Sequence, residues 1–94
     1  MSCDHKSESE RLASVLRSYG FEKVRVEGYG SYHIVVVEVC DDFYVFTSVS
    51  CSDSTYYYEL AVGDENFIIA LEKVPCLDRA VEVIKKVYEL AVPR

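Results

Sequence analysis

Positive charge is missing from the middle of this chain. From Ile34 to Glu72 there is no lysine or arginine, whereas eight acidic residues occur there, and the 94 residues together carry a net charge of −6. Such a surface repels phosphate groups, because it offers no cations to replace the counterions of a nucleic acid or an anionic membrane. The charge distribution therefore argues against nucleic acid and membranes as partners.

Side-chain amides are also scarce, since the sequence has no glutamine and a single asparagine, Asn66. Depletion of these thermolabile residues is typical of hyperthermophilic proteins. We therefore expect a thermophilic source. Intracellular proteins of hyperthermophiles are the known exception to the rule that cytoplasmic thiols stay reduced. The four cysteines can accordingly be free thiols, metal ligands or disulfide partners.

Long apolar runs are absent, and the first ten residues are mostly polar. Apolar stretches of strand length are too short to cross a bilayer, and this N-terminus lacks the apolar segment of a secretory signal. We expect a cytoplasmic protein. The length suits one domain with one core, so residues 1–94 are predicted to form a single domain, with residues 1–6 as a mobile tail.

Amphipathic helical patterns lie at both ends of the chain. Ser7 and Glu10 have the spacing of a capping box at a helix start, and Gly20 suits the left-handed residue that follows a helix. Pro75 ends the last apolar run and suits the first turn of a second helix. Apolar residues recur every three or four positions in both segments, so each predicted helix has one apolar stripe.

Five short β-forming runs separated by turn residues fill the chain between these helices. We predict strands at residues 22–28, 32–40, 43–51, 55–62 and 67–74. The connections are too short for a parallel crossover, so the sheet must be an antiparallel meander in the order 1-2-3-4-5. The predicted fold class is α+β, with element order α-β-β-β-β-β-α and two helices packed on one face of the sheet.

Turn lengths predict which side chains share a face of the sheet. If residues 41 and 42 form a two-residue hairpin turn, Val37 lies opposite Phe46, and a four-residue turn between the last two strands places Leu60 opposite Ile69. A one-residue slip would exchange the faces. The face under the helices would carry Val35, Val37, Val39, Phe46, Tyr58, Leu60, Val62, Phe67, Ile69 and Leu71.

The second face of the sheet is also apolar, because residues 34–37 are four apolar residues in succession on one strand. With both helices on the first face, the second needs another cover. We expect a homodimer formed sheet against sheet, because exposed apolar patches usually mark association surfaces. A different protein partner, or helices that straddle the sheet, are the alternatives. The predicted interface residues are Ile34, Val36, Val45, Val49 and Tyr57.

The same topology gathers thiols and imidazoles at one end of the sheet. These groups suit tetrahedral Zn²⁺, but no C-x-x-C or H-x-x-x-H spacing is present. A disulfide among Cys3, Cys51 and Cys76, or inert buried thiols, are the alternatives, and no cofactor is indicated. A small-ligand or metal-binding protein is therefore a second interpretation. Its candidate ligands are Cys3, His5, His33, Cys51 and Cys76.

A third interpretation is a small hydrolase. The predicted register places Ser50 opposite His33, with Asp53 in the adjacent turn, and these residue types suit a base-activated hydroxyl. No strained nucleophile turn or oxyanion donor is recognisable around Ser50. The preferred interpretation therefore remains a non-catalytic interaction or regulatory module that self-associates.

Overall fold

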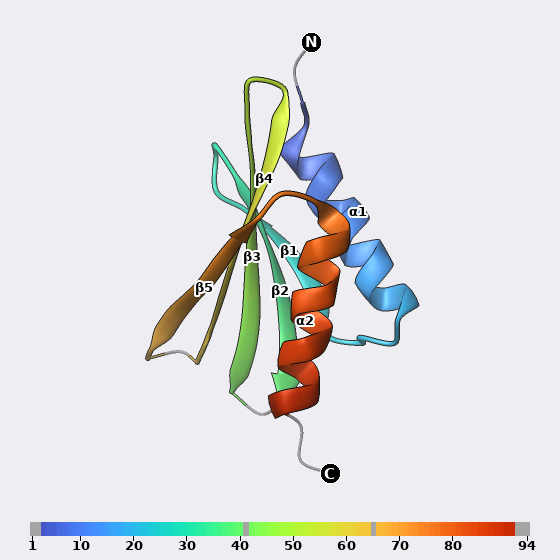
Figure 1. The fold of residues 1–94 in the computed structure, drawn as a ribbon, viewed down its shortest axis with the longest axis vertical. Coiled ribbons are helices and arrows are strands. Elements are labelled where there is room, and N and C mark those ends of the chain that lie inside the picture. The colour runs from blue at the N-terminus through green and yellow to red at the C-terminus, as the bar shows by residue number, and fades with distance from the viewer. Residues whose placement is uncertain (1–2, 41, 65, 92–94) are drawn as a thin grey trace.

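The computed structural model describes residues 3–40, 42–64 and 66–91 of the chain (Figure 1). Its five strands form one antiparallel sheet in the order β1-β2-β3-β4-β5. The predicted α+β class and meander are confirmed. The elements are α1 (His5–Ser18), β1 (Val24–Gly28), β2 (His33–Cys40), β3 (Phe43–Ser52), β4 (Thr55–Gly63), β5 (Ile68–Val74) and α2 (Leu77–Ala91).

Both helices lie on the same side of the sheet (Figure 1), as predicted. The alternative in which they straddle the sheet is therefore wrong. Helix α1 packs against β1, β2 and β3, and α2 lies beside it, over β2 to β5. Apolar side chains of the helices and of the face beneath them form the core, because each amphipathic stripe must bury against another element. The other side of the sheet, here called the open face, has no helix over it.

Helix α1 begins two residues before the predicted capping box. Asp4 is the N-cap, and its Oδ1 atom accepts hydrogen bonds from the backbone N–H groups of Lys6 and Ser7 at 3.1 and 3.2 Å. A carboxylate is favoured here because it satisfies free N–H groups and also faces the positive end of the helix dipole. Residues 4–6, predicted as tail, therefore belong to the helix and its cap. Residues 1 and 2 lie outside the described part.

Helix α1 ends as the sequence predicted. Gly20 has a φ of 100°, and the N–H groups of Gly20 and Phe21 donate to the carbonyls of Arg17 and Leu16 at 3.0 and 3.2 Å. This pair of bonds is a Schellman ending, which needs a left-handed residue after the helix. The ending turns the chain back toward β1, where buried Phe21 joins the core.

The register of the β2–β3 hairpin differs by one residue from the prediction. Val37 lies opposite Val45 and not opposite Phe46, because the ladder shifts between Glu38 and Cys40. Such a β-bulge adds one residue to one strand, and a one-residue shift moves every side chain of the partner strand to the other face. Val45 and Val49, predicted at the interface, are fully buried in the core, and Phe46, predicted in the core, lies on the open face.

The β4–β5 hairpin also differs from the prediction. Its four-residue turn lies one residue later in the chain than predicted, so that Val62 lies opposite Ile69 and Gly63 opposite Ile68. The Oδ1 atom of Asp64 holds this turn by accepting two backbone hydrogen bonds at 2.8 Å each. Phe67 and Ile69, predicted in the core, are 65% and 52% exposed, because this end of β5 projects away from α2 (Figure 1). The predicted core position of Leu71 lies outside the described side chains.

One polar residue is enclosed in the core. Thr47 is 0% exposed and lies opposite Val35 and Leu60 on the helix-covered face. Among the described residues, its Oγ1 atom finds no hydrogen-bond partner. A buried hydroxyl without a partner lowers stability, because it has lost its bonds to water without replacement.

We therefore expect Thr47→Val to raise the free energy of unfolding by about 1 kcal/mol, since the methyl group has the same shape and needs no hydrogen bond. Urea unfolding followed by circular dichroism measures this change. Thr55→Val, at an exposed position, is the control and should change stability by less than about 0.5 kcal/mol. A loss of stability in Thr47→Val would show that the hydroxyl is well satisfied.

Candidate functional site

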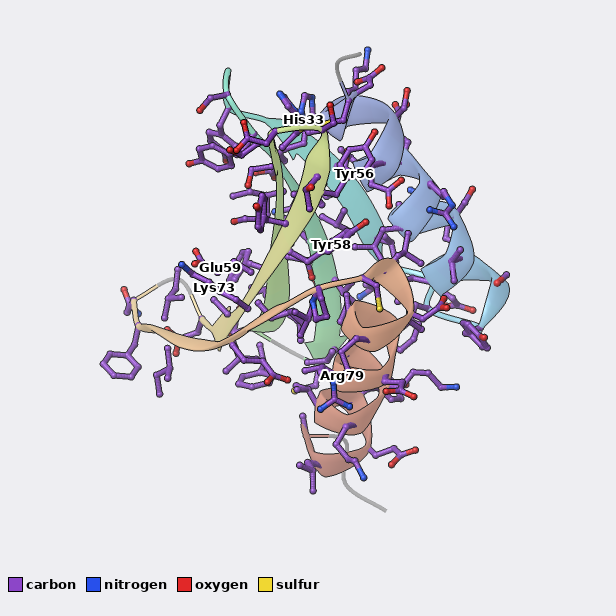
Figure 2. All side chains as sticks on the ribbon, turned by 45° about the horizontal axis from the view of Figure 1, so that its top comes forward. His33, Tyr56, Tyr58, Glu59, Lys73 and Arg79 are labelled. Atoms are coloured by element: carbon purple, nitrogen blue, oxygen red, sulfur yellow. A yellow bond between two sulfur atoms is a disulfide. The ribbon has the colours of Figure 1, made fainter. Side chains whose placement is uncertain are left out.

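The start of α1 is attached to three neighbouring strands at one end of the sheet. Figure 2 shows His33 and Tyr56 at this end, beside the first turn of the helix. The three attachment residues are consecutive at the start of α1, at positions 3 to 5, whereas the strand residues that they contact are far away in the sequence. The contacts join Cys3 to Cys51 on β3, Asp4 to Tyr56 on β4 and His5 to His33 on β2.

The two histidines form a close imidazole pair. Their Nδ1 atoms lie 2.7 Å apart, and their ring centroids are 4.8 Å apart with the planes tilted by 44°. Both residues are partly buried. A hydrogen bond between two imidazole nitrogens requires one ring to donate and the other to accept. The two Nδ1 atoms are therefore directed at each other.

Cys3 and Cys51 form a disulfide with a Cα–Cα distance of 6.2 Å. We call Cys3, His5, His33 and Cys51 the thiol–imidazole end. Cys76, a predicted ligand and disulfide candidate, is not part of it: Cys76 is a free, exposed thiol. The reason is that β5 ends opposite Tyr58, before it reaches the level of Thr55, where β4 begins. Cys40 is also free and lies at the other end of the sheet.

In the disulfide form, this end of the sheet does not offer a complete set of metal ligands. Within residues 3–40, 42–64 and 66–91, no group of three or more histidine, cysteine, aspartate or glutamate side chains is arranged to hold a metal ion. Two imidazoles remain when the sulfur atoms are bonded to each other. The predicted zinc ligands are therefore only partly brought together in the disulfide form.

The hydrolase geometry predicted for Ser50 is wrong. His33 lies opposite Val49 on the helix-covered face, whereas Ser50 lies opposite Tyr57 on the open face. Asp53 is in the β3–β4 turn with a φ of 52°. The β-bulge in β2 is again the cause, because the one-residue shift separates His33 and Ser50 by the thickness of the sheet. His33 is therefore not placed to activate this hydroxyl.

Sequence reasoning missed a buried carboxylate close to this end. Glu8 of α1 is 8% exposed and accepts a hydrogen bond from the hydroxyl of Tyr58, which is 3% exposed. Its other partner is Arg11, with 3.2 Å between Nη1 and Oε2. Burial, and then the hydrogen bond to Glu8, raise the pKa of Tyr58 above its usual value. The available signal was that Glu8 precedes Leu12 by four residues and so lies on the apolar stripe.

We expect Tyr58→Phe to lower the free energy of unfolding by about 1.5–3 kcal/mol, because it removes a buried hydrogen bond to a charged group. The stability lost in Tyr58→Phe should depend on pH. Unfolded tyrosine ionises near pH 10, while folded Tyr58 keeps its proton at that pH, so wild-type stability falls as the pH rises through this range. Urea unfolding at pH 7 and near pH 10 measures both effects.

Tyr19→Phe is the matched control, because Tyr19 is 58% exposed and its ring contact with Lys85 does not need the hydroxyl. This variant should keep both the wild-type stability and its decline at alkaline pH. Equal effects of the two substitutions would contradict the role given to the Glu8 contact.

Removal of the disulfide should have a large effect on stability. The bond joins residues with a sequence separation of 48, and closing a loop of this length is worth about 4 kcal/mol in the chain-entropy description. Cys51→Ser is expected to lower the free energy of unfolding by about 3–4 kcal/mol, measured by chemical unfolding without reductant. Wild type treated with a reductant should match it.

Cys76→Ser is the control for that experiment, because this thiol is free and exposed. It should leave stability within about 0.5 kcal/mol of wild type. Thiol titration of the unfolded, unreduced chain should find two reactive thiols, from Cys40 and Cys76. Four reactive thiols would refute the disulfide.

The open face of the sheet has an apolar half and a polar half. Near the β4–β5 turn, the ladders place two cross-strand rows side by side. The first runs through Ala61, Phe46 and Val36 to Arg25, and the second through Ile68, Gly63 and Tyr44 to Glu38. We call Val36, Tyr44, Phe46, Ala61 and Ile68 the open-face patch. Of the predicted interface residues, Ile34, Val36 and Tyr57 lie on this face.

The polar half lies toward the thiol–imidazole end. Ser48, Ser50, Tyr57 and Glu59 line a hollow of about 530 Å³ there. Glu59 is next to Lys73 (Figure 2), with 3.7 Å between Oε2 and Nζ. This ion pair is exposed and therefore adds little to stability. The described lining of the hollow combines serine hydroxyls, tyrosine side chains and this ion pair.

The two edges of the sheet differ in charge. On β1, Arg25 pairs with Glu27 at 2.6 Å, and Lys23, which precedes the strand, pairs with Glu38 at 2.9 Å. Charged side chains on an edge strand discourage pairing with another chain. The β5 edge begins with Ile68, which is 58% exposed, and carries no charge before Glu72. Exposed apolar surface is therefore concentrated at the β5 side.

Comparison with protein-family models, curated proteins and solved structures finds no match to this chain. Among the described residues, neither helix is long and apolar enough to span a membrane.

Proposed function

We propose that this protein is a small non-catalytic interaction module that forms a homodimer through the open face of its sheet. The observation that carries the proposal is the open-face patch, which lies on the side of the sheet that neither helix covers. A sheet side exposed to water normally alternates to polar residues. This one places Tyr44, Phe46, Ala61 and Ile68 together around Val36, which is itself 1% exposed.

The composition of the patch supports an association surface. Tyr44 and Phe46 are half-buried, and their rings lie 5.9 Å apart. Aromatic residues are enriched at protein interfaces, and charged residues are depleted from interface centres. The charged side chains beside the patch are already paired within the chain, as Arg25 with Glu27 and Lys23 with Glu38. Burial of the patch would therefore leave no unpaired cation at this margin.

A second copy suits this surface because it can use the same patch. With a twofold axis parallel to β3, Phe46 on the central strand faces the partner near the axis, and β1 of one copy lies over β5 of the other. Five strands spaced by about 4.8 Å give a face roughly 20–24 Å wide, and two such faces pack about 10 Å apart. A standard interface buries about 800 Å² on each partner, which a face of this size can approach.

Cytoplasmic location and a thermophilic source are part of the proposal. The near absence of side-chain amides and the acidic composition support them. A disulfide in a cytoplasmic protein is consistent with a hyperthermophilic source. The hollow on the polar half of the open face provides no comparable argument for a ligand, because the only charged groups among its described lining residues are the paired Glu59 and Lys73.

We expect the wild-type protein to have twice its chain mass of 10.7 kDa in light scattering coupled to size exclusion. Phe46→Glu and Ile68→Glu should shift it to the monomer, because each buries a charge in the apolar interface. Circular dichroism should show that both variants stay folded, since neither side chain belongs to the core.

Leu90→Glu is the matched control, because Leu90 is 81% exposed but lies on α2, on the other side of the sheet. It should remain dimeric. A monomeric wild type at high concentration would refute the homodimer and leave a different protein as the partner of the open face. Dissociation by Leu90→Glu, with no effect of Phe46→Glu, would place the interface on the helices.

A further inference from the structure

We infer that reduction of the Cys3–Cys51 bond turns the thiol–imidazole end into a four-ligand zinc site, with Cys3, His5, His33 and Cys51 as ligands. The oxidised protein closes this end with a disulfide, and the reduced protein closes it with the metal. The site is independent of the open face, which lies on the other side of the sheet.

The imidazole pair supplies two ligands that already converge. The Nδ1 atoms of His5 and His33 are 2.7 Å apart, and Nδ1 of a neutral imidazole is a normal zinc ligand. Tetrahedral zinc with Zn–N distances of about 2.0–2.1 Å separates two nitrogen ligands by about 3.3 Å. The rings therefore need to move apart by only about 0.6 Å, which small side-chain rotations can provide.

The cysteines are placed to supply the other two ligands. Cys3 is two residues before His5, at the same helix start. His33 lies opposite Val49, and Cys51 is two residues further along β3 on the same face. Diagonal neighbours of this kind have Cβ atoms about 7–8 Å apart or less. Each element that contributes an imidazole therefore has a thiol beside it.

The spacing of Cys3 and Cys51 suits both the disulfide and the zinc-bound state. Their Cα atoms are 6.2 Å apart. Once the bond is broken, rotation of the two side chains can open the sulfur atoms to about 3.8 Å, the separation set by two Zn–S bonds of about 2.3 Å. The backbone of α1 does not need to move, because the hydrogen bonds between Asp4 and Tyr56 continue to hold it.

A dithiol can serve as the reductant of the Cys3–Cys51 bond. The dithiol transfers two electrons and two protons to the Cys3–Cys51 bond and itself becomes a disulfide, which leaves two thiols on the protein. Zinc binding then releases one proton from each thiol, and the two thiolates neutralise the charge of Zn²⁺. The imidazoles bind as neutral ligands, so the His5–His33 hydrogen bond is replaced by two Zn–N bonds.

Zinc binding would restore the link between the start of α1 and the sheet that reduction of the disulfide removes. Structural zinc sites of this ligand set contribute directly to folding, so the metal would again hold the start of α1 on β2 and β3. Cys40 and Cys76 are free in the structure, at the far end of the sheet and on the exposed surface. They take no part in the site and provide internal controls.

The experiment compares oxidised and reduced wild type after exposure to Zn²⁺ and removal of excess metal. A phosphine should be the reductant in vitro, because a small dithiol would itself bind zinc. We expect one zinc per reduced chain and none per oxidised chain by elemental analysis. Co²⁺ in place of zinc should give the visible absorption of a tetrahedral thiolate site in the reduced protein alone. Zinc should also raise the melting temperature of the reduced form.

Single substitutions test which residues bind the zinc ion. Cys51→Ser should abolish stoichiometric zinc uptake, whereas Cys40→Ser and Cys76→Ser should retain it. Loss of a ligand is expected to weaken binding by more than the about 10–100-fold that second-shell changes cost, so His5→Ala and His33→Ala should both be impaired. His5 is at the first turn of α1, so its variant tests the imidazoles even if His33→Ala does not fold.

Three results would overturn the inference. One is reduced wild type that takes up no more zinc than reduced Cys51→Ser. Another is full-affinity binding in folded His5→Ala, which would mean that the thiols bind zinc without the imidazoles. The third is loss of binding in Cys76→Ser, which would assign the metal to a different group of cysteines.

Discussion

The β-bulge at the end of β2 is the constraint on which the rest of the structure depends. It adds one residue between Glu38 and Cys40, and the side-chain period of a strand is two. Every residue of β3 is therefore placed on the face opposite to that of an unbulged hairpin. Val45 and Val49 complete the core, Phe46 forms the centre of the open-face patch, and Ser50 is separated from His33.

Uneven covering of the sheet follows from the size of the chain. Two helices on one face shield the strands near β1 to β3, while α2 leaves the turn end of β5 exposed. The open face receives no helix at all. Its apolar half combines residues from four strands, and none of them is conspicuous alone. The open-face patch and the exposed end of β5 have one physical origin, which is more apolar sheet surface than the helices can cover.

The opposite end of the sheet is organised by the first residues of α1. Cys3, Asp4 and His5 reach three different strands through a disulfide, a pair of hydrogen bonds and an imidazole contact. Nearby, the buried Glu8 meets Tyr58. Polar and sulfur-containing groups can be accommodated here because each has a partner from another element.

Local sequence signals determined much of this architecture. The helix ending at Gly20, the strand order and the placement of both helices on one face followed from short connections and apolar periodicity, which act over a few residues. The gathering of Cys3, His5, His33 and Cys51 at one end followed from topology. Only the tertiary structure decided the register, since a bulge of one residue leaves no distinct mark on composition. It also decided the position of Cys76 and the burial of Glu8. Such features depend on packing between elements distant in the sequence, and packing settles which of two nearly equivalent alignments buries more apolar surface.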